Sequence, residues 1–196
     1  IVSTGMATQT ELAEAVEVLQ RNGCHDIILL KCTSNYPARP IDANLHTIPH
    51  LAELFGCQVG LSDHTAGIGV SVAAVALGAT VIEKHFVLDR SEGGVDAEFS
   101  LEPFEMKQLV EETERAWTAL GNVHYGVTDK EIASRKHRRS LYISADLVAG
   151  TVLTPENLRA IRPGFGLAPK YLNLVLGRQV KADVKRGTAL SWDLLL

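Results

Sequence analysis

Two histidines stand at the ends of neighbouring predicted strands, in the runs GLSDHT and TVIEKHF. Because side chains alternate along a strand, Ser62 and His64 share one face of the first strand, and Glu83 and His85 share one face of the second. If both faces point the same way, the two imidazoles meet. Neutral imidazoles with carboxylates nearby suit a divalent ion such as Mn²⁺, with positions left open for substrate oxygens. Hydrogen-bonded histidines at the mouth of a barrel are the alternative, and the residues alone leave both interpretations open.

Further polar groups follow the predicted strands and could bind an anion. Clustered hydroxyls at strand ends can hold a phosphate or a carboxylate, although single ones are more often helix caps. The candidates are Ser3, Thr4, Thr33, Ser34 and Ser62.

Two loops add charged groups. The acidic, glycine-bearing run DRSEGGVD (residues 89–96) has the composition of a mobile segment that closes over a site and supplies a carboxylate, and a merely solvated loop has the same composition. The run IRPGFG places Arg162 on a Pro-Gly turn, where a cation could bind a carboxylate or an amide oxygen. A surface arginine beside a turn is the simpler interpretation of the same pattern.

The elements that must position these residues are repeated βα units. Apolar runs predict four strands, and each is followed by a helical pattern with caps such as Thr8-x-x-Glu11 or a closing glycine. This order is typical of a parallel α/β fold at the spacing of an eight-fold barrel, in which the polar strand ends converge on one face. Four units cannot close a barrel, so we expect that the first half is missing or is supplied by another chain. The predicted strands are residues 1–4, 27–32, 58–63 and 80–86, and the predicted helices are residues 8–21, 44–55, 67–77 and 103–120.

After Gly121 the pattern changes to short β-like pieces without a further helical run. An internal repeat lies in this region: the pattern Ala-Asp-x-x-x-Gly-Thr-x-Leu-Thr/Ser occurs at residues 145–154 and again at residues 182–191. Two copies predict a small β domain with a pseudo-two-fold axis, because a solenoid needs at least three repeats.

Composition excludes several classes of protein. The 196 residues are 46% hydrophobic and 21% charged, as in an ordinary globular protein. The net charge of −4 argues against a nucleic-acid partner, and the basic run at residues 135–139 is better explained as a solvated linker. Glycines and hydroxyl residues interrupt the charge-free stretch 66–82, so we expect no membrane segment. Three cysteines without a C-x-x-C pair favour a reducing cytoplasm: Cys24, Cys32 and Cys57.

Taken together, five short runs resemble the phosphoenolpyruvate-dependent nonulosonic acid synthases, the family that makes sialic, legionaminic and pseudaminic acids. Their order and spacing are specific, and they span nearly the whole chain. Within the family, residues 88–103 and the C-terminal tail are most similar to the synthases of pseudaminic acid. The five runs are STGM (3–6), KCTSNYP (31–37), GLSDHT (60–65), IEKHF (82–86) and IRPGFG (161–166).

The resemblance implies a fold and a domain organisation. Residues 1–122 would be the second half of a TIM (β/α)8 barrel, residues 123–136 a linker, and residues 137–196 an antifreeze-like (SAF) β-rich domain. The absent strands would include the family's phosphate-binding lysines and an acidic residue near the metal, so we expect this piece to be inactive alone.

The resemblance also implies roles for individual residues. His64 and His85 would bind a catalytic Mn²⁺ or a similar ion. Three serines would contact phosphoenolpyruvate: Ser3, Ser34 and Ser62.

The sugar would face other groups in the same family. Tyr36 and Asp96 would contact it, with Asp96 orienting the sugar or taking part in proton transfer. Arg162 would reach the partner subunit's barrel in a domain-swapped homodimer and bind an N-acetyl group.

The implied reaction joins C3 of phosphoenolpyruvate to the aldehyde carbon of an open-chain N-acetylated hexose. With 2,4-diacetamido-2,4,6-trideoxy-altrose the product is pseudaminic acid, and synthesis of N-acetylneuraminate or legionaminic acid is the close alternative. A hypothesis of another class is a non-catalytic protein that holds a glycan or an ice surface with its antifreeze-like domain. A third is a half-barrel that pairs with its own copy.

Overall fold

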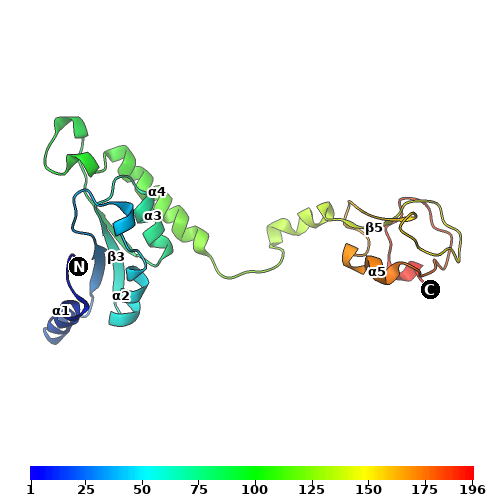
Figure 1. Ribbon diagram of the computed structural model, residues 1–196, viewed down its shortest axis with the longest axis horizontal. Helices are drawn as coiled ribbons and strands as arrows, with labels where there is room; N and C mark the ends of the chain where they lie inside the picture. The colour runs from blue at the N-terminus through cyan, green and yellow to red at the C-terminus, as the bar shows by residue number, and fades with distance from the viewer. The chain divides into compact units, whose positions relative to one another are not determined.

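The computed structural model describes all residues, 1–196, and forms two compact units, Ile1–Val123 and His124–Leu196 (Figure 1). The first unit confirms the predicted α/β fold class. Its four strands are all parallel and lie in the order β1-β2-β3-β4, so consecutive strands are neighbours, as in the second half of a TIM barrel. The strands are β1 Val2–Ser3, β2 Ile28–Cys32, β3 Gln58–Asp63 and β4 Val81–Lys84, and the helices are α1 Gln9–Arg21, α2 Thr47–Phe55, α3 Gly69–Ala76 and α4 Pro103–Leu120.

Local chemistry explains where these helices begin and end. The Thr8 hydroxyl accepts a hydrogen bond from the Glu11 amide, and the Glu11 carboxylate accepts one from the Thr8 amide, so α1 starts with a capping box. The helix α2 ends at Gly56, whose φ of 61° is left-handed. Its predicted start at residue 44 is wrong by three residues, because Asn44 itself has a φ of 45° and lies outside the helix.

The two faces of the sheet have different neighbours. One face packs against the helices through a core of buried apolar residues: Leu12, Val16, Ile27, Leu29, Ile48, Leu51, Val59, Leu61, Ala74 and Ala79. The register pairs Cys32 with Ser62 and Ser62 with Glu83, so these three side chains share the opposite face. We call this opposite face the site face, and the face with the apolar core the helix face.

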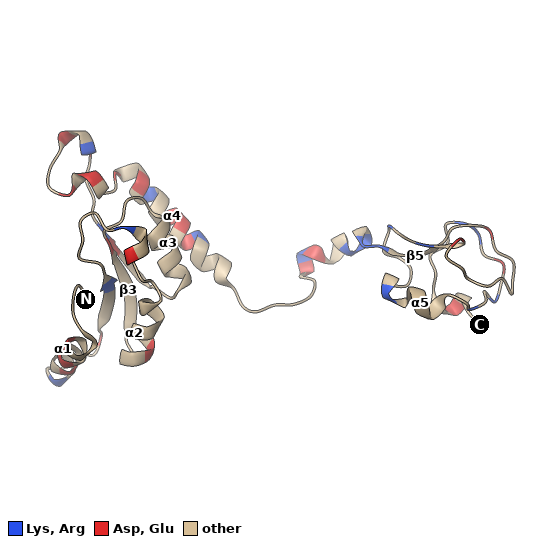
Figure 2. Ribbon diagram, in the orientation of Figure 1, with Lys and Arg blue, Asp and Glu red and all other residues tan.

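Between β4 and α4 the chain forms two short 3₁₀ turns, Arg90–Glu92 and Ala97–Phe99. The helix α4 lies beside α3 (Figure 1), and charged residues recur along it (Figure 2). None of the helices in the structure combines the length and the hydropathy needed to cross a membrane.

The second unit contains the antiparallel pair β5 Ser140–Ile143 and β6 Leu158–Ile161, the short helix α5 Leu172–Val175, and 3₁₀ turns at Pro169–Tyr171 and Trp192–Leu194. The expectation of no helical run beyond Gly121 is wrong, because Asp129–His137 forms a 3₁₀ helix. A second capping box explains its start: the Thr128 amide and hydroxyl both donate to the Glu131 carboxylate, at 2.9 and 2.6 Å.

The internal repeat of the second unit forms a reciprocal contact. The Asp146 carboxylate accepts from the Arg186 amide at 2.8 Å, and the Asp183 carboxylate accepts from the Ala149 amide at 2.9 Å. Each donor lies three residues after the aspartate of its own copy. The glycines Gly150 and Gly187 both have a positive φ, of 81° and 88°, at equivalent turns. The predicted pseudo-two-fold arrangement is therefore present, and each copy uses its aspartate to cap the other.

Candidate active site

The structure brings His64 and His85 together on the site face. Their ring centroids are 5.1 Å apart at an interplanar angle of 70°. Tyr36 lies against His64 at a centroid distance of 4.3 Å, and Phe99 lies against His85 at 5.0 Å. His64 is buried and Tyr36 is about half exposed. The predicted meeting of the two imidazoles is thus present, with an aromatic ring packed against each one.

The hydrogen bond of His64 fixes which ring nitrogen faces the site. Nδ1 lies 3.1 Å from the carbonyl oxygen of Thr33, so Nδ1 holds the proton and donates it. The Cys32 thiol lies 3.9 Å from the same nitrogen. The Nε2 lone pair is consequently free. A backbone carbonyl that orients an imidazole in this way is the usual second partner of a metal-binding histidine.

His85 faces a carboxylate in the loop before α4. Its Nδ1 lies 3.8 Å from Oδ2 of Asp96, a close approach that is too long for a hydrogen bond. Asp96 has a left-handed φ of 66°, which is unusual for a residue other than glycine and recurs at ligand-binding sites. The backbone therefore takes a costly conformation at the residue whose carboxylate faces His85.

Ser62 and Glu83 form the floor of the site face below the two rings. The Ser62 hydroxyl donates to Oε1 of Glu83 at 2.6 Å, a bond between adjacent strands that follows directly from the register. Ser62 is buried, whereas Glu83 is exposed. No role for Glu83 was inferred from the sequence, although its position two residues before His85 already placed both on one face.

The remaining predicted residues lie at different distances from the histidines. Ser34 lies on the β2 side of the site, with its hydroxyl 3.8 Å from the Cys32 sulfur. Ser3 is exposed on β1, where it pairs in register with Leu30 on the site face. Arg162 is exposed in the second unit, directly after β6, so it is not part of this cluster.

The loop 89–96 is linked to the start of α4. Arg90 donates from its amide to Glu102 at 2.9 Å and from Nε to the carbonyl of Ser100 at 3.0 Å, and its guanidinium also contacts Glu105. The Asp89 carboxylate accepts from the amide and hydroxyl of Ser91, and these bonds lower the pKa of Asp89. The acidic loop is thus fixed at both of these points.

At the end of β2, Lys31 lies on the helix face. Its ammonium donates to the carbonyl of Cys32 at 2.9 Å and to the hydroxyl of Thr33 at 2.7 Å. Burial lowers the pKa of Lys31, and the nearby Cys32 opposes that shift. Thr33, whose carbonyl orients His64, is therefore held from behind by Lys31.

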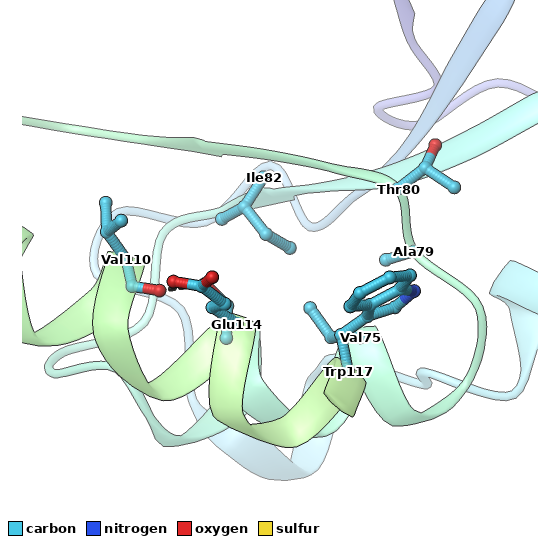
Figure 3. Close-up of a pocket in the computed structure, with 8 residues that line it drawn as sticks. Val75, Ala79, Thr80, Ile82, Val110, Glu114 and Trp117 are labelled. Carbon is cyan, nitrogen blue, oxygen red and sulfur yellow. Dashed lines mark hydrogen bonds between the residues drawn. The ribbon is translucent and has the colours of Figure 1, made fainter. Parts of the chain in front are cut away.

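The largest groove of the first unit is not at the histidines. It has a volume of about 540 Å³ and lies on the helix face between β4, α3 and α4 (Figure 3). Its walls are mostly apolar, and Trp117 and Val110 of α4 are exposed in it. We do not assign chemistry to this groove, because among its lining residues only Glu114 is ionisable.

The donor set at the histidines fits an open metal site in chemistry and in orientation. It supplies two imidazoles, one oriented by a carbonyl and the other close to a carboxylate, which suits a divalent ion with exchangeable positions. No cluster of three or more His, Cys, Asp or Glu side chains with the arrangement of a metal site occurs in the structure. The two histidines therefore form a partial ligand set.

Comparison with known proteins defines the class of this fold and site. The model of the NeuB family matches residues 1–125, and the model of the SAF domain matches residues 138–196. The chain belongs to the NeuB family, and the resemblance found in the sequence is confirmed. The match to the SAF domain agrees with the reciprocal β unit described above.

Individual relatives narrow the comparison. The chain is 44% identical over 190 residues to the pseudaminic acid synthase of Campylobacter jejuni, covering 97% of this chain and 55% of that protein. It is 41% identical over 198 residues to the N,N'-diacetyllegionaminic acid synthase of Legionella pneumophila, covering 98% of this chain and 56% of that protein. The chain thus spans little more than half the length of these relatives.

A solved structure agrees with the fold. The N-acetylneuraminic acid (sialic acid) synthetase of Leptospira borgpetersenii, crystallised with citrate, matches with a TM-score of 0.61 at 39% identity. The match covers 68% of this chain and 47% of that one.

Proposed function

We propose that this chain forms the two-histidine part of the active site of a cytoplasmic synthase. The reaction condenses phosphoenolpyruvate with open-chain 2,4-diacetamido-2,4,6-trideoxy-altrose to give pseudaminic acid and phosphate. The observation behind this proposal is the contact of His64 and His85 at the carboxyl edge of a parallel sheet, in a chain of the NeuB family. The identity of 44% to a relative named pseudaminic acid synthase supports the choice of product.

The two histidines are the proposed ligands of a divalent ion, for which we favour Mn²⁺. Such an ion supplies Lewis-acid polarisation of the sugar's aldehyde oxygen. The chain's own contribution is to present the ligands. The bond from Nδ1 of His64 to Thr33 directs Nε2 outward, and the packing of Phe99 on His85 restricts the second ring.

The serines of the site face are proposed to contact phosphoenolpyruvate. Ser62 is buried at the floor, while Ser3 and Ser34 lie exposed on the two neighbouring strand ends. In the reaction C3 of phosphoenolpyruvate bonds to the aldehyde carbon, water adds at C2, and phosphate leaves from C2. Hydroxyl donors at strand ends suit the anionic groups that this substrate brings.

The sugar is proposed to lie against Tyr36 and Asp96. Tyr36 is half exposed beside His64 and offers both a ring face and a hydroxyl, and the Asp96 carboxylate lies 3.8 Å from His85. Arg162 is proposed to act on the N-acetyl group of a sugar in the partner's barrel, in a homodimer with exchanged C-terminal domains. In this proposal residues 1–122 form the barrel part, 123–136 the linker and 137–196 the antifreeze-like domain.

Mass spectrometry of the product tests the assignment. The full-length protein, given phosphoenolpyruvate and the diacetamido-trideoxy-altrose, is expected to release pseudaminic acid and one phosphate per turnover. Formation of legionaminic acid or N-acetylneuraminate alone, from the corresponding hexoses, would refute the choice of product and leave the reaction class intact.

Removal of the metal tests the reaction class itself. Chelation of the full-length protein is expected to abolish condensation, and Mn²⁺ is expected to restore it. Condensation that continues unchanged after chelation would contradict a role for the two histidines as ligands.

A further inference from the structure

A buried ion pair lies directly behind the two histidines, on the helix face of the same strand ends. Nζ of Lys84 lies 2.9 Å from Oδ2 of Asp63, and both side chains are 1% exposed. Asp63 precedes His64 in the chain and Lys84 precedes His85. Because side chains alternate along a strand, the ion pair and the two imidazoles point to opposite faces of the same two strands.

The Asp63 carboxylate makes a complete set of hydrogen bonds. It accepts from the amide and the hydroxyl of Thr65, at 2.9 and 2.7 Å, and from the hydroxyl of Ser71 in α3, at 2.6 Å. With Lys84 this gives four donors to one buried carboxylate. The carboxylate therefore joins β3, β4, α3 and the loop after His64 at a single point.

Lys84 contacts the chain on both sides of His64. Its ammonium bonds to the Asp63 carboxylate and also to the carbonyl of Thr65, the residues immediately before and after that histidine. Lys84 is itself the residue before His85. One side chain thus links the backbone around one histidine to the backbone of the other.

No backbone hydrogen bond replaces this link. Asp63 and Lys84 are the last residues paired in register between β3 and β4. Beyond them the strands separate: the carbonyl of His64 accepts from the amide of Ala38 at 2.9 Å, and the carbonyl of His85 accepts from the amide of Leu101 at 2.8 Å. The two histidines are bonded to different loops, so their spacing depends on the contact at Asp63 and Lys84.

We propose that Asp63 and Lys84 are positioning residues that set the separation of the His64 and His85 rings. A general role in stability explains the pair less well, since a buried ion pair often contributes little net stability compared with apolar residues, whereas it can fix the register of neighbouring elements. The consequence for metal binding rests on the proposed function, but the consequence for ring spacing does not.

The test uses the full-length protein with both charges removed together. In the double variant Asp63→Asn, Lys84→Met no unpaired charge remains buried, so the fold is expected to persist. The matched control is Leu51→Ala, which opens a cavity in the same core on α2, away from the strand ends. Two readouts are compared: the NOE between the ring protons of His64 and His85 in metal-free protein, and the Kd for Mn²⁺ alone.

The double variant is expected to lose the NOE and to bind Mn²⁺ about tenfold more weakly or worse, the range typical of changes outside the ligands themselves. The control is expected to keep both. A folded double variant with an intact NOE and an unchanged Kd would overturn the proposal. If the wild-type protein binds no Mn²⁺, the proposed metal site fails, and the NOE alone still decides the positioning role.

Ser71→Ala provides a milder variant should the double variant not fold. It removes one donor to Asp63 and leaves the ion pair in place, so the protein is expected to fold. A weakened NOE and a raised Kd would support the proposal. No change in either quantity would overturn it, because the hydrogen bond from α3 is part of the same contact.

Discussion

Gly60 is the position where the smallest added side chain should do the most damage. It lies in the middle of β3, on the site face, opposite Val81 of β4. A Cβ atom there would lie 2.6 Å from Cδ2 of Leu30 and 3.0 Å from the carbonyl carbon of Val81, and closer still to the carbonyl oxygen. Leu30 is a side chain that can rotate, but the Val81 carbonyl belongs to the backbone of the next strand. The strand β4 must therefore move.

The size of the effect follows from this overlap. Inserting a methyl group into a packed interior costs about 1–3 kcal/mol, and an overlap with backbone puts Gly60→Ala near the upper end, about 3 kcal/mol. For a unit of this size that corresponds to a fall in Tm of about 10 °C. Since His85 follows β4, the Kd for Mn²⁺ is expected to rise as well.

Urea unfolding measures this prediction in one unit at a time. Each unit contains one of the two tryptophans, so Trp192→Phe leaves Trp117 as the reporter of the first unit. The control is Gly69→Ala at the start of α3, where a Cβ would meet nothing within 4 Å and which should be neutral or slightly stabilising. Equal stability of the two variants would refute the packing argument for β3 and β4.

Three further changes have defined outcomes. Phe99→Ala should lower the stability of the first unit by about 3–4 kcal/mol and weaken Mn²⁺ binding, because the buried ring of Phe99 packs on His85; unchanged urea unfolding would contradict this. Thr8→Ala should cost about 1 kcal/mol through loss of the α1 cap, measured by thermal unfolding. The Arg186 amide, followed by Lys185, lowers the pKa of Asp146, so wild type should exceed Asp146→Asn in stability above pH 3.8, with the difference vanishing as the pH falls through the lower folded-state pKa; acid unfolding curves that coincide at neutral pH would disprove it.

The sequence contains enough local information to predict the βα units and several helix ends. Pro103 and Gly121 mark both ends of α4, and the Thr8 box marks the start of α1. The start of α2 was mistaken because Asn44 adopts a left-handed conformation that its residue type permits but does not require. The 3₁₀ helix at Asp129–His137 was missed because its polar sequence has no apolar face to reveal a period.

The site could be predicted only as far as strand alternation reaches. Alternation and adjacency placed His64 beside His85, and the structure brings them together. The bond between Ser62 and Glu83 depends on the register of two parallel strands, which no short pattern specifies. The packing of Phe99 on His85 depends on the path of a loop, and a loop's path is set by long-range contacts such as those of Arg90.

The central claim is that His64 and His85 bind one cation together. A crystal of the full-length protein grown with Mn²⁺ and measured at the manganese absorption edge tests it directly. The account predicts a single anomalous peak bonded to Nε2 of His64 and to a ring nitrogen of His85. A peak that contacts only one of the two rings, or no peak at this face of the sheet, would contradict it.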